Sequence, residues 1–391
     1  MKKLIFLNSH PIQYFAPLYK FLNGDGINCS VWYCSSETLN LKRDQQFGVK
    51  IKWDIPLLDG YRYKFFKNYS FKPSIFNGFL GLMNFGVIRE LFKEKDAAIV
   101  VHGYHYLTHF LVLLLGRFSK NKICLRLETP QSQESKNSNL KRALKSFFLR
   151  RIIFSGVDTF LYIGNQNKEF YQRLGVQEHQ LVFCPYAVDN ERFSKSFLEF
   201  KDQRDCLKER NGIEPNQKVI LYSGKYIQKK RPLDLLEAFH ALNNPEVWLV
   251  MVGEGEYREK LEKTILEKHI KNVLLTGFIN QSKITEYYSL ADVFVMCSGN
   301  GETWGLSTNE AMNFDLPIIV SDRTGCVADL VMEGVNGYSF QLGNIQELTN
   351  KLKLVIEKDN LTYQISSREI IKNYSFSTIS TNLKKLLNVS N

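Results

Sequence analysis

Unbroken apolar runs of five to seven residues recur along the chain and alternate with longer segments of mixed polarity. Continuous apolar runs indicate strands that are buried on both faces, as strands in parallel sheets are. In the first half these runs cover residues 4–8, 29–34, 97–103, 122–128, 158–164 and 181–187. In the second half they cover residues 218–224, 247–253, 272–278, 292–298 and 316–322.

Helical patterns such as those of residues 231–243 and 257–269 separate the runs. The repeated strand–helix–strand order predicts two doubly wound, Rossmann-like α/β domains that face each other across a cleft. The predicted parts are an N-terminal domain over 1–195, a polar linker over 196–216, a second domain over 217–370 and a C-terminal helix over 371–391 that could pack back on the first domain. Ligands of such sheets bind beyond the carboxyl ends of the strands.

Length and cysteine content narrow the class of protein. A chain of 391 residues is too long for one core, which agrees with two domains. The seven cysteines form no C-x-x-C pair and are read as reduced thiols of a cytoplasmic protein. The apolar run at the N-terminus is too short for a signal peptide. The longest run, residues 110–116, is far shorter than the roughly 20 residues that span a bilayer.

The positive charge of the chain is confined to its first half. Residues 1–200 sum to +12 and residues 201–391 to −1. Such asymmetry favours an anionic partner of the first half, which can be nucleic acid, a phosphorylated substrate or a membrane surface. Solubility alone is the alternative explanation, and the charge count leaves both open.

The stretch GETWGLSTNEAM (301–312) follows a predicted strand and carries two carboxylates eight positions apart. We expect Glu302 on a loop and a helix beginning with Ser307 or Thr308 as its N-cap. The N-terminus of that helix would suit a phosphate. Glu310, about one turn into the helix, would accept hydrogen bonds from a neutral diol such as a ribose.

A second stretch, SGKYIQKKRP (223–232), supplies cations after another predicted strand. Lys225 and Lys230 lie near the start of a predicted helix, where positive charge is unfavourable unless an anion is bound. A solvated cluster that also includes Lys229 and Arg231 explains the same residues without a ligand.

Together these stretches resemble family 4 of the retaining glycosyltransferases, part of glycosyl transferases group 1, with the GT-B architecture. The motifs that carry the resemblance are E-x7-E from Glu302 to Glu310, Gly224-Lys225 with Lys230, AVDNERF (187–193) and GVNGYSF (334–340). The resemblance implies an enzyme that uses a nucleotide diphosphate sugar; we favour a UDP-sugar, with a GDP-sugar as the alternative. The donor contacts that it implies are Gly224, Lys225, Lys230, Gly305, Leu306, Ser307, Thr308 and Glu310, with Glu302 at the donor sugar.

No D-x-D motif is present, so we expect no metal and no other cofactor, with lysines neutralising the diphosphate. The family also places histidine near the transferred sugar, where this chain reads VVHGYHYLTH (100–109). His102 and His105 join Glu302 as catalytic candidates. Which of His102, His105 and His109 faces the cleft stays open.

The first half also holds acceptor-side candidates. His10, Gln13 and Tyr14 follow the first predicted strand in the loop NSHPIQYF (8–15). Two segments, 61–72 and 140–154, mix basic and aromatic residues, as surfaces that dock on membranes do. The membrane-contact candidates are Lys141, Arg142, Lys145, Arg150 and Arg151. The alternative is that the apolar side of 140–154 packs on the sheet and leaves the basic residues in water.

The sequence therefore predicts a retaining, metal-independent glycosyltransferase that elongates a glycan, with a lipid-linked acceptor in bacterial surface polysaccharide, lipopolysaccharide or capsule synthesis. We expect it in the cytoplasm, peripheral at the inner face of the cytoplasmic membrane, and we expect no nucleic-acid partner. A nucleotide-sugar epimerase of the same fold and a non-catalytic sugar- or nucleotide-binding module are the alternatives.

Overall fold

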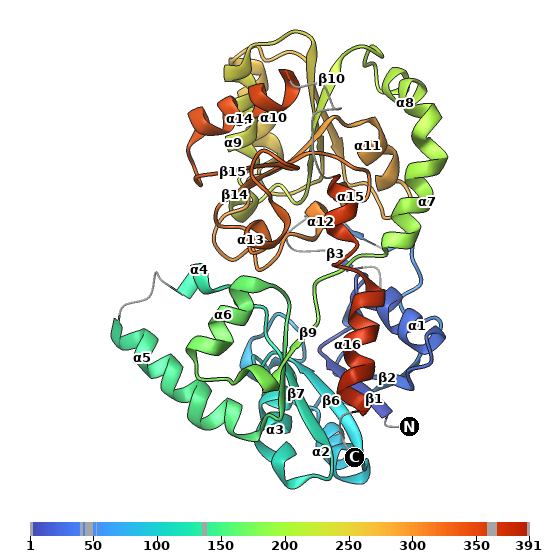
Figure 1. Cartoon of the computed structure of the whole chain (residues 1–391), viewed down its shortest axis with the longest axis vertical. Helices are drawn as coiled ribbons and strands as arrows, with labels where there is room; N and C mark the ends of the chain where they lie inside the picture. The colour runs from blue at the N-terminus through green and yellow to red at the C-terminus, as the bar shows by residue number, and fades with distance from the viewer. Residues whose placement is uncertain are drawn as a thin grey trace. The chain divides into compact units, whose positions relative to one another are not determined.

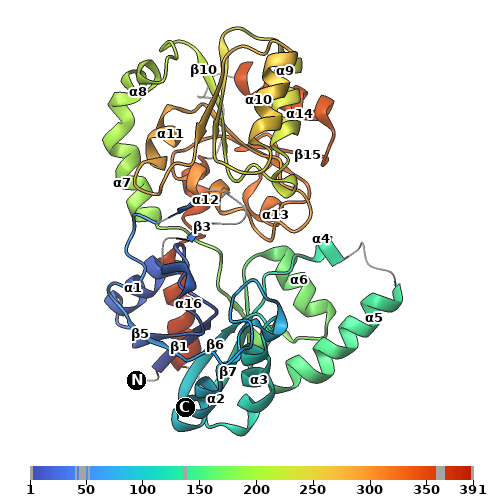
Figure 2. The ribbon, with the colours of Figure 1, turned by 180° about the vertical axis from the view of Figure 1, so that it is seen from behind.

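The computed structural model describes residues 3–39, 42–43, 50–51, 53–134, 139–357 and 366–388, with the backbone alone at 42–43, 50–51, 133–134, 139–141 and 388. The chain forms two compact units (Figures 1 and 2). Unit 1 comprises Met1–Leu41, Pro56–Tyr186 and Ser375–Asn391. Unit 2 comprises Lys42–Ile55 and Ala187–Tyr374.

Unit 1 is built on a parallel sheet with the strand order β5-β2-β1-β6-β7-β8-β9. Its strands are β1 (Lys3–Asn8), β2 (Cys29–Tyr33), β5 (Arg62–Phe65), β6 (Ala97–His102), β7 (Lys122–Arg126), β8 (Thr159–Tyr162) and β9 (Leu181–Phe183). Its helices are α1 (Ala16–Gly24), α2 (Phe85–Lys93), α3 (Leu107–Leu115), α4 (Gln131–Glu134), α5 (Asn139–Phe148), α6 (Asn165–Arg173) and α16 (Phe376–Asn388). Apolar residues of α2, α3 and α6 pack on the sheet face that carries Leu7, Val101 and Leu125.

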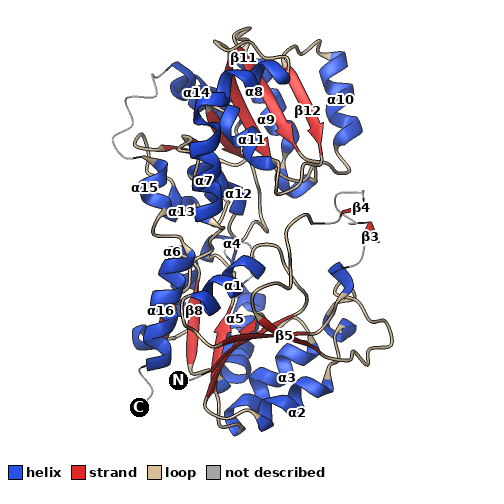
Figure 3. Ribbon diagram, turned by 90° about the vertical axis from the view of Figure 1, so that its right-hand side faces the viewer, coloured by secondary structure: helices blue, strands red, loops and turns tan. Residues whose placement is uncertain are grey.

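Unit 2 contains a second parallel sheet with the order β12-β11-β10-β13-β14-β15. Its strands are β10 (Lys218–Ser223), β11 (Val247–Val252), β12 (Val273–Gly277), β13 (Val293–Met296), β14 (Ile318–Ser321) and β15 (Gly337–Phe340), with the antiparallel pair β3 (Lys42–Arg43) and β4 (Lys50–Ile51) separate from it. Its helices are α7 (Asn190–Phe200), α8 (Arg204–Arg210), α9 (Pro232–Leu242), α10 (Arg258–Glu267), α11 (Ile284–Leu290), α12 (Leu306–Met312), α13 (Val327–Leu330), α14 (Ile345–Glu357) and α15 (Ser367–Ile371). Figure 3 shows strands β11 and β12 of this sheet, and apolar residues of helices α9, α10 and α14 pack on one of its faces.

The prediction of two doubly wound α/β folds with parallel sheets is confirmed, and each predicted apolar run contains a strand. Two sheet strands were not predicted. The edge strand β5 has the sequence RYKF and is mostly exposed, so it lacks the apolar signature of a buried strand. The edge strand β15, GYSF, is short and begins with a glycine.

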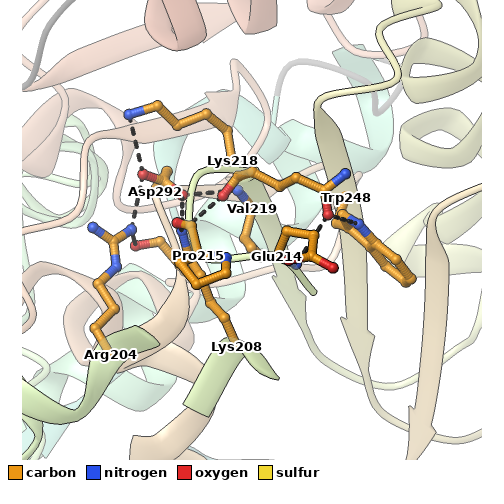
Figure 4. Close-up of polar contacts among 10 residues, drawn as sticks. Arg204, Lys208, Glu214, Pro215, Lys218, Val219, Trp248 and Asp292 are labelled. Carbon is orange, nitrogen blue, oxygen red and sulfur yellow. Dashed lines mark hydrogen bonds and ion pairs between the residues drawn. The ribbon is translucent and has the colours of Figure 1, made fainter. Parts of the chain in front are cut away.

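The stretch 196–216, which we predicted to be a linker, folds within unit 2 as the end of α7 and as α8. A buried carboxylate, Asp292, ties this stretch to the sheet (Figure 4). Its oxygens lie 2.8 Å from Arg204 Nη2, 3.8 Å from Lys208 Nζ and 3.5 Å from Lys218 Nζ. It also accepts a 2.8 Å hydrogen bond from the Val219 backbone N–H at the start of β10.

The last described helix, α16, belongs to unit 1 and lies beside α1 and β9 (Figure 1). Asp25, directly after α1, accepts hydrogen bonds from Ser380 at 2.5 Å and Lys384 at 2.7 Å. Asn382 donates to the Phe183 carbonyl at 3.0 Å. These contacts join the two ends of the described chain within one unit.

Candidate functional site

The E-x7-E motif lies at the carboxyl edge of the unit 2 sheet, with Glu302 on the loop between β13 and α12 and Glu310 in α12. The predicted N-cap is wrong: Gly305 occupies that position and α12 begins at Leu306. Gly305 has φ 103°, which disfavours a side chain, and an added Cβ would lie 2.7 Å from Met296 Sδ. Sequence reasoning favoured a hydroxyl cap, whereas close packing against β13 selects glycine.

A second glycine fixes the loop that holds Glu302. An added Cβ on Gly325 would lie 1.9 Å from the Thr303 carbonyl oxygen, so only glycine fits there. The Gly325 N–H donates to the Glu302 carbonyl at 3.1 Å. The backbone on either side of the Glu302 side chain is therefore held by close packing with the segment after β14.

Residues 224–231, which we call the lysine loop, follow β10 at the same edge of the sheet. Lys225 is half-buried and its carbonyl accepts a 2.8 Å hydrogen bond from Tyr222 Oη. Lys230 ends a short 3-10 helix, and α9 begins two residues later with Pro232. An added Cβ on Gly253, after β11, would lie 1.9 Å from the Gly224 carbonyl oxygen. Sequence reasoning missed this role of Gly253, although the spacing G-E-G (253–255) marks a close backbone approach.

The two motifs meet in an ion pair. Lys230 Nζ lies 2.5 Å from Glu302 Oε2, and Lys229 Nζ lies 3.6 Å from the same oxygen. Lys229 also donates to the Gly301 carbonyl at 3.1 Å. Burial raises the pKa of Glu302, but the charges of Lys230 and Lys229 outweigh it and hold the pKa below its usual value. Glu302 is therefore a carboxylate at neutral pH, although only 8% of it is exposed.

Glu310 is buried inside α12 and held by two side chains that sequence reasoning missed. Tyr288 Oη donates to Glu310 Oε2 at 2.7 Å, and Gln281 Nε2 donates to Oε1 at 3.4 Å. Gln281 Oε1 in turn accepts from Arg192 Nη2 at 2.8 Å. Tyr288 and Gln281 come from α11 and the turn before it, and no motif in the sequence marks them.

The remaining predicted donor contacts differ in exposure. Leu306 and Ser307 are half-buried, whereas Thr308 is fully buried. The Thr308 hydroxyl contacts Met296 Sδ at 3.9 Å and its N–H donates to the Gly305 carbonyl at 2.9 Å. The side chain of Thr308 therefore serves the core of unit 2 rather than a ligand.

The three histidines of 100–109 occupy different environments in unit 1. His102 ends β6, and its buried Nε2 has no hydrogen-bond partner among the described residues. His105 is exposed on the following loop, against the ring of Tyr104. His109 is buried in α3, where burial lowers its pKa to about 4. His109 is thus a core histidine.

The acceptor-side candidates lie on the loop between β1 and α1. Gln13 and Tyr14 are half-buried. His10 Nδ1 lies 2.9 Å from Ser9 Oγ. Burial lowers the pKa of His10 to about 4 despite the opposing charge of Glu37, so its ring is neutral at pH 7.

The basic candidates of 140–154 lie on α5 and the turn after it. Arg150 and Arg151 are exposed, Arg142 and Lys145 are half-buried, and the side chain of Lys141 lies outside the described residues. Lys145 Nζ lies 5.9 Å from the centre of the Phe170 ring. Within the described ranges no helix has the length and apolar character needed to cross a bilayer.

Exposed apolar side chains gather in unit 1 and form what we call the aromatic face. Its members are Tyr69, Phe71, Phe76, Phe79, Leu80, Phe85, Leu144 and Phe147, and Phe71 is 98% exposed. Phe79 packs on Phe110 with ring centres 5.7 Å apart, and Phe110 packs on Phe148 of α5 at 6.4 Å. These ring contacts link the exposed loop 69–85 to α5. Contiguous exposed apolar surface is typical of interaction sites.

A separate cavity of about 300 Å³ lies in unit 2 near the starts of β13 and β14. Its lining includes Phe197, Arg204, Asp292 and Phe314. This is the opposite edge of the sheet from the motifs, so the cavity is not part of the candidate site. Among the described residues, no three His, Cys, Asp or Glu side chains gather in a way that could hold a metal ion.

Comparison with known proteins finds a family model that matches part of the chain. Residues 203–375 match the family model described as "Glycosyl transferases group 1". The chain is 29% identical over 212 residues to sulfoquinovosyl transferase SQD2 of Arabidopsis thaliana, covering 53% of this chain and 39% of that protein. It is 27% identical over 256 residues to alpha-monoglucosyldiacylglycerol synthase of Acholeplasma laidlawii, covering 63% of this chain and 58% of the relative.

The chain thus covers less than two thirds of the length of either relative. Among solved structures it resembles Anabaena HepE in complex with UDP and glucose, with a TM-score of 0.71 and 17% identity over 99% of both chains. At this identity the likeness shows the fold, which is that of the two-domain GT-B glycosyltransferases.

Proposed function

We propose that the chain, whose residues 203–375 match the model of the glycosyl transferases group 1, is a retaining, metal-independent glycosyltransferase of family 4. Unit 2 holds a nucleotide diphosphate sugar, a UDP-sugar in preference to a GDP-sugar, and unit 1 recognises a carbohydrate acceptor. The observation that carries the proposal is the ion pair between Lys230 and Glu302. It brings the lysine loop and the E-x7-E motif together at the edge where parallel sheets bind ligands.

The proposed roles follow from charge and hydrogen bonding. Lys225 and Lys230 neutralise the diphosphate as it leaves, which supplies the stabilisation that a metal ion would otherwise give. Glu310, oriented by Tyr288, accepts hydrogen bonds from the ribose hydroxyls. Glu302 contacts the donor sugar, and no protein nucleophile is required because the acceptor attacks the face from which the diphosphate departs. His102 and His105 of unit 1 are the catalytic candidates on the acceptor side.

The names of the relatives support the substrate classes. One curated relative is named for the transfer of sulfoquinovose and the other for the synthesis of a glycolipid, and HepE was solved with UDP and glucose. We therefore propose a lipid-linked glycan as the acceptor, in the synthesis of a bacterial surface polysaccharide, lipopolysaccharide or capsule.

We further propose that the enzyme works in the cytoplasm, at the inner face of the cytoplasmic membrane. The aromatic face supplies apolar side chains, and residues 1–200 supply an excess of positive charge. Each basic residue near an anionic surface contributes about 1 kcal/mol, so a few suffice for reversible docking.

The test is a turnover assay with UDP-, GDP- and ADP-sugars and a lipid-linked acceptor, in EDTA and with added Mg²⁺. We expect transfer with one donor class, equal rates in EDTA and Mg²⁺, and a product whose anomeric configuration matches the donor. Activity that requires Mg²⁺ would refute the metal-independent mechanism. Conversion of the donor to an epimer would identify an epimerase, and donor binding without turnover would identify a binding module.

A further inference from the structure

Three polar side chains line up at the carboxyl edge of the unit 1 sheet. His102 of β6 pairs with Arg126 of β7, and Asn8 of β1 follows the pair formed by Leu7 and Val101. Residues in register on neighbouring strands share a face of the sheet, so all three side chains lie on one face. Adjacent strands are about 4.8 Å apart, which places the three groups within reach of one small ligand.

Arg126 is the unusual member of this row. It is only 2% exposed, yet among the described residues no carboxylate forms an ion pair with it. Its Nη1 donates to the Cys184 carbonyl at 2.9 Å. Its Cζ lies 5.5 Å from the centre of the Phe15 ring and 4.9 Å from that of Tyr186. Its Nε and Nη2 are buried and have no hydrogen-bond partner in the part of the chain that the structure describes.

The two unused nitrogens have a defined geometry. Nε–H and one Nη2–H of a guanidinium point the same way and form the planar fork that binds two oxygens of a carboxylate or phosphate. Nη1, on the other edge, is anchored by Cys184. The fork is therefore fixed in direction by the fold, and its hydrogen-bonding capacity is unmet.

The neighbouring His102 and Asn8 add polarity. Burial lowers the pKa of Arg126, but the negative charge of Glu128 is among those that raise it, without forming an ion pair among the described residues. Burial, and next the charge of Arg126, holds the pKa of His102 well below its usual value, so its ring is neutral. Asn8 Nδ2 donates to Tyr19 Oη at 2.5 Å, and Asn8 Oδ1 is a buried acceptor that no described residue donates to. A buried cation without an ion-pair partner is costly, and such a charge is normally paired.

We propose that Arg126 forms the base of an oxyanion subsite in unit 1, which binds a phosphate or carboxylate group of a hydroxylated acceptor. The fork of Arg126 takes the oxyanion, and Asn8 Oδ1 accepts a hydrogen bond from a hydroxyl of the same ligand. This subsite rests on the proposed function, because it assigns an anionic sugar, either a sugar phosphate or a sugar acid, to the acceptor side. It is separate from the donor diphosphate, which is assigned to Lys225 and Lys230 of unit 2.

The test uses the full chain saturated with UDP, with arginine side chains labelled with ¹⁵N. Glucose 6-phosphate, glucuronate and neutral glucose are added in turn while the Nε–H signal of Arg126 is followed. We expect the phosphate, the acid or both to shift this signal, and glucose to leave it unchanged. The phosphate alone would identify a phosphorylated acceptor, and the acid alone a uronic one. No shift with either anion at tens of millimolar would overturn the proposal.

Arg126→Lys keeps the charge and removes the fork, so it should weaken the anion roughly 10- to 100-fold, as the loss of hydrogen bonds to a charged group does. UDP affinity should stay within twofold of the wild type, which separates this subsite from the donor site. Equal anion affinity in the variant would also overturn the proposal. Because Arg126 is buried, the fold of the variant is checked by circular dichroism, and the wild-type titration decides alone if the variant does not fold.

Discussion

Lys230 Nζ and Glu302 Oε2 lie 2.5 Å apart, so the lysine assigned to the donor diphosphate is held by the carboxylate assigned to the donor sugar. A bound diphosphate must compete with Glu302 for the same ammonium group. Without the donor, the positive charge of Lys230 compensates the negative charge of the buried Glu302 carboxylate. The ion pair thus links the lysine loop to the E-x7-E motif when no ligand is bound.

Glu302→Gln should separate donor binding from transfer. Removing the carboxylate removes the competitor for Lys230, so UDP should bind as tightly as in the wild type or up to about tenfold more tightly. Sugar transfer should fall at least tenfold, because the contact with the sugar is weakened. Lys230→Ala is the comparison and should weaken UDP roughly 10- to 100-fold. Calorimetric titration with UDP and a turnover assay measure both, and weaker UDP binding in Glu302→Gln would contradict the assignment.

Tyr288→Phe tests whether Glu310 must be oriented to bind the donor. The substitution keeps the ring that packs on Phe314 but removes the hydroxyl that donates to Glu310. We expect UDP affinity to fall by roughly 3- to 10-fold, the effect of one hydrogen bond of about 1 kcal/mol. Tyr287→Phe, on the same helix and without a recorded contact to Glu310, is the control and should bind UDP normally. Equal affinities in the two variants would remove Tyr288 from the site.

Gly253→Ala should destabilise the protein through the lysine loop. The added Cβ would lie 1.9 Å from the Gly224 carbonyl oxygen, and relief requires the backbone after β10 to move. We expect a loss of at least about 2 kcal/mol in the free energy of unfolding. Gly24→Ala has no atom within 4 Å of its new Cβ and is the matched control. Chemical denaturation of both variants measures this loss. Similar denaturation midpoints would show that the backbone after β10 moves at little cost in stability.

Much of the fold follows from the sequence because a strand buried on both faces leaves an unbroken apolar run. The edge strand β5 escaped this rule, since Arg62, Tyr63 and Lys64 are exposed. The donor motif was recognisable from Glu302 and Glu310, but their partners Lys230, Tyr288 and Gln281 depend on how separate loops meet. No local pattern carries that information.

The segment 140–154 shows a different limit of periodicity. Its apolar residues fall on one side of an ideal helix, which predicts that they share one environment. In the structure α5 passes into a π-helical turn at Leu149–Ile153, which shifts the apolar stripe. Leu149 and Ile153 are buried, whereas Leu144 and Phe147 are more than 60% exposed. Packing on the sheet therefore describes only the end of this segment, and its docking on a membrane stays a prediction.

Acid should destabilise the protein through His109. Burial lowers the pKa of His109 to about 4 in the folded state, whereas an unfolded histidine titrates near 6.5. Between these values the unfolded state binds the extra proton, so stability is complete above pH 6.5 and falls by roughly 1.4 kcal/mol per pH unit towards pH 4. His109→Gln should remove this part of the slope, while the exposed His179→Gln should keep it. Urea unfolding across pH 4–8 measures it, and parallel slopes for wild type and His109→Gln would contradict the prediction.

Removing apolar side chains from the aromatic face should weaken membrane docking. The triple substitution of Phe71, Phe79 and Phe147 to Ser should reduce sedimentation with anionic liposomes at least tenfold, because each buried aromatic ring contributes about 1.5–3 kcal/mol. Leu198→Ser with Leu266→Ser removes exposed apolar side chains from unit 2 and is the control.

Replacing Arg142, Lys145, Arg150 and Arg151 by Gln should lower liposome binding most at low salt, where screening is weakest. Equal recovery of all variants would leave the positive charge as a solubility feature.

The placement of α16 has a consequence for how the protein is made. Asp25 and Ser380 are hydrogen-bonded across 355 positions of the chain. During translation the ribosome releases all of unit 2 before it releases the helix that completes unit 1. One side of α1 therefore stays uncovered while the later half of the polypeptide is still being synthesised. Closing so long a loop is entropically slow, so assembly of unit 1 is a late event of biosynthesis even though most of its residues emerge first.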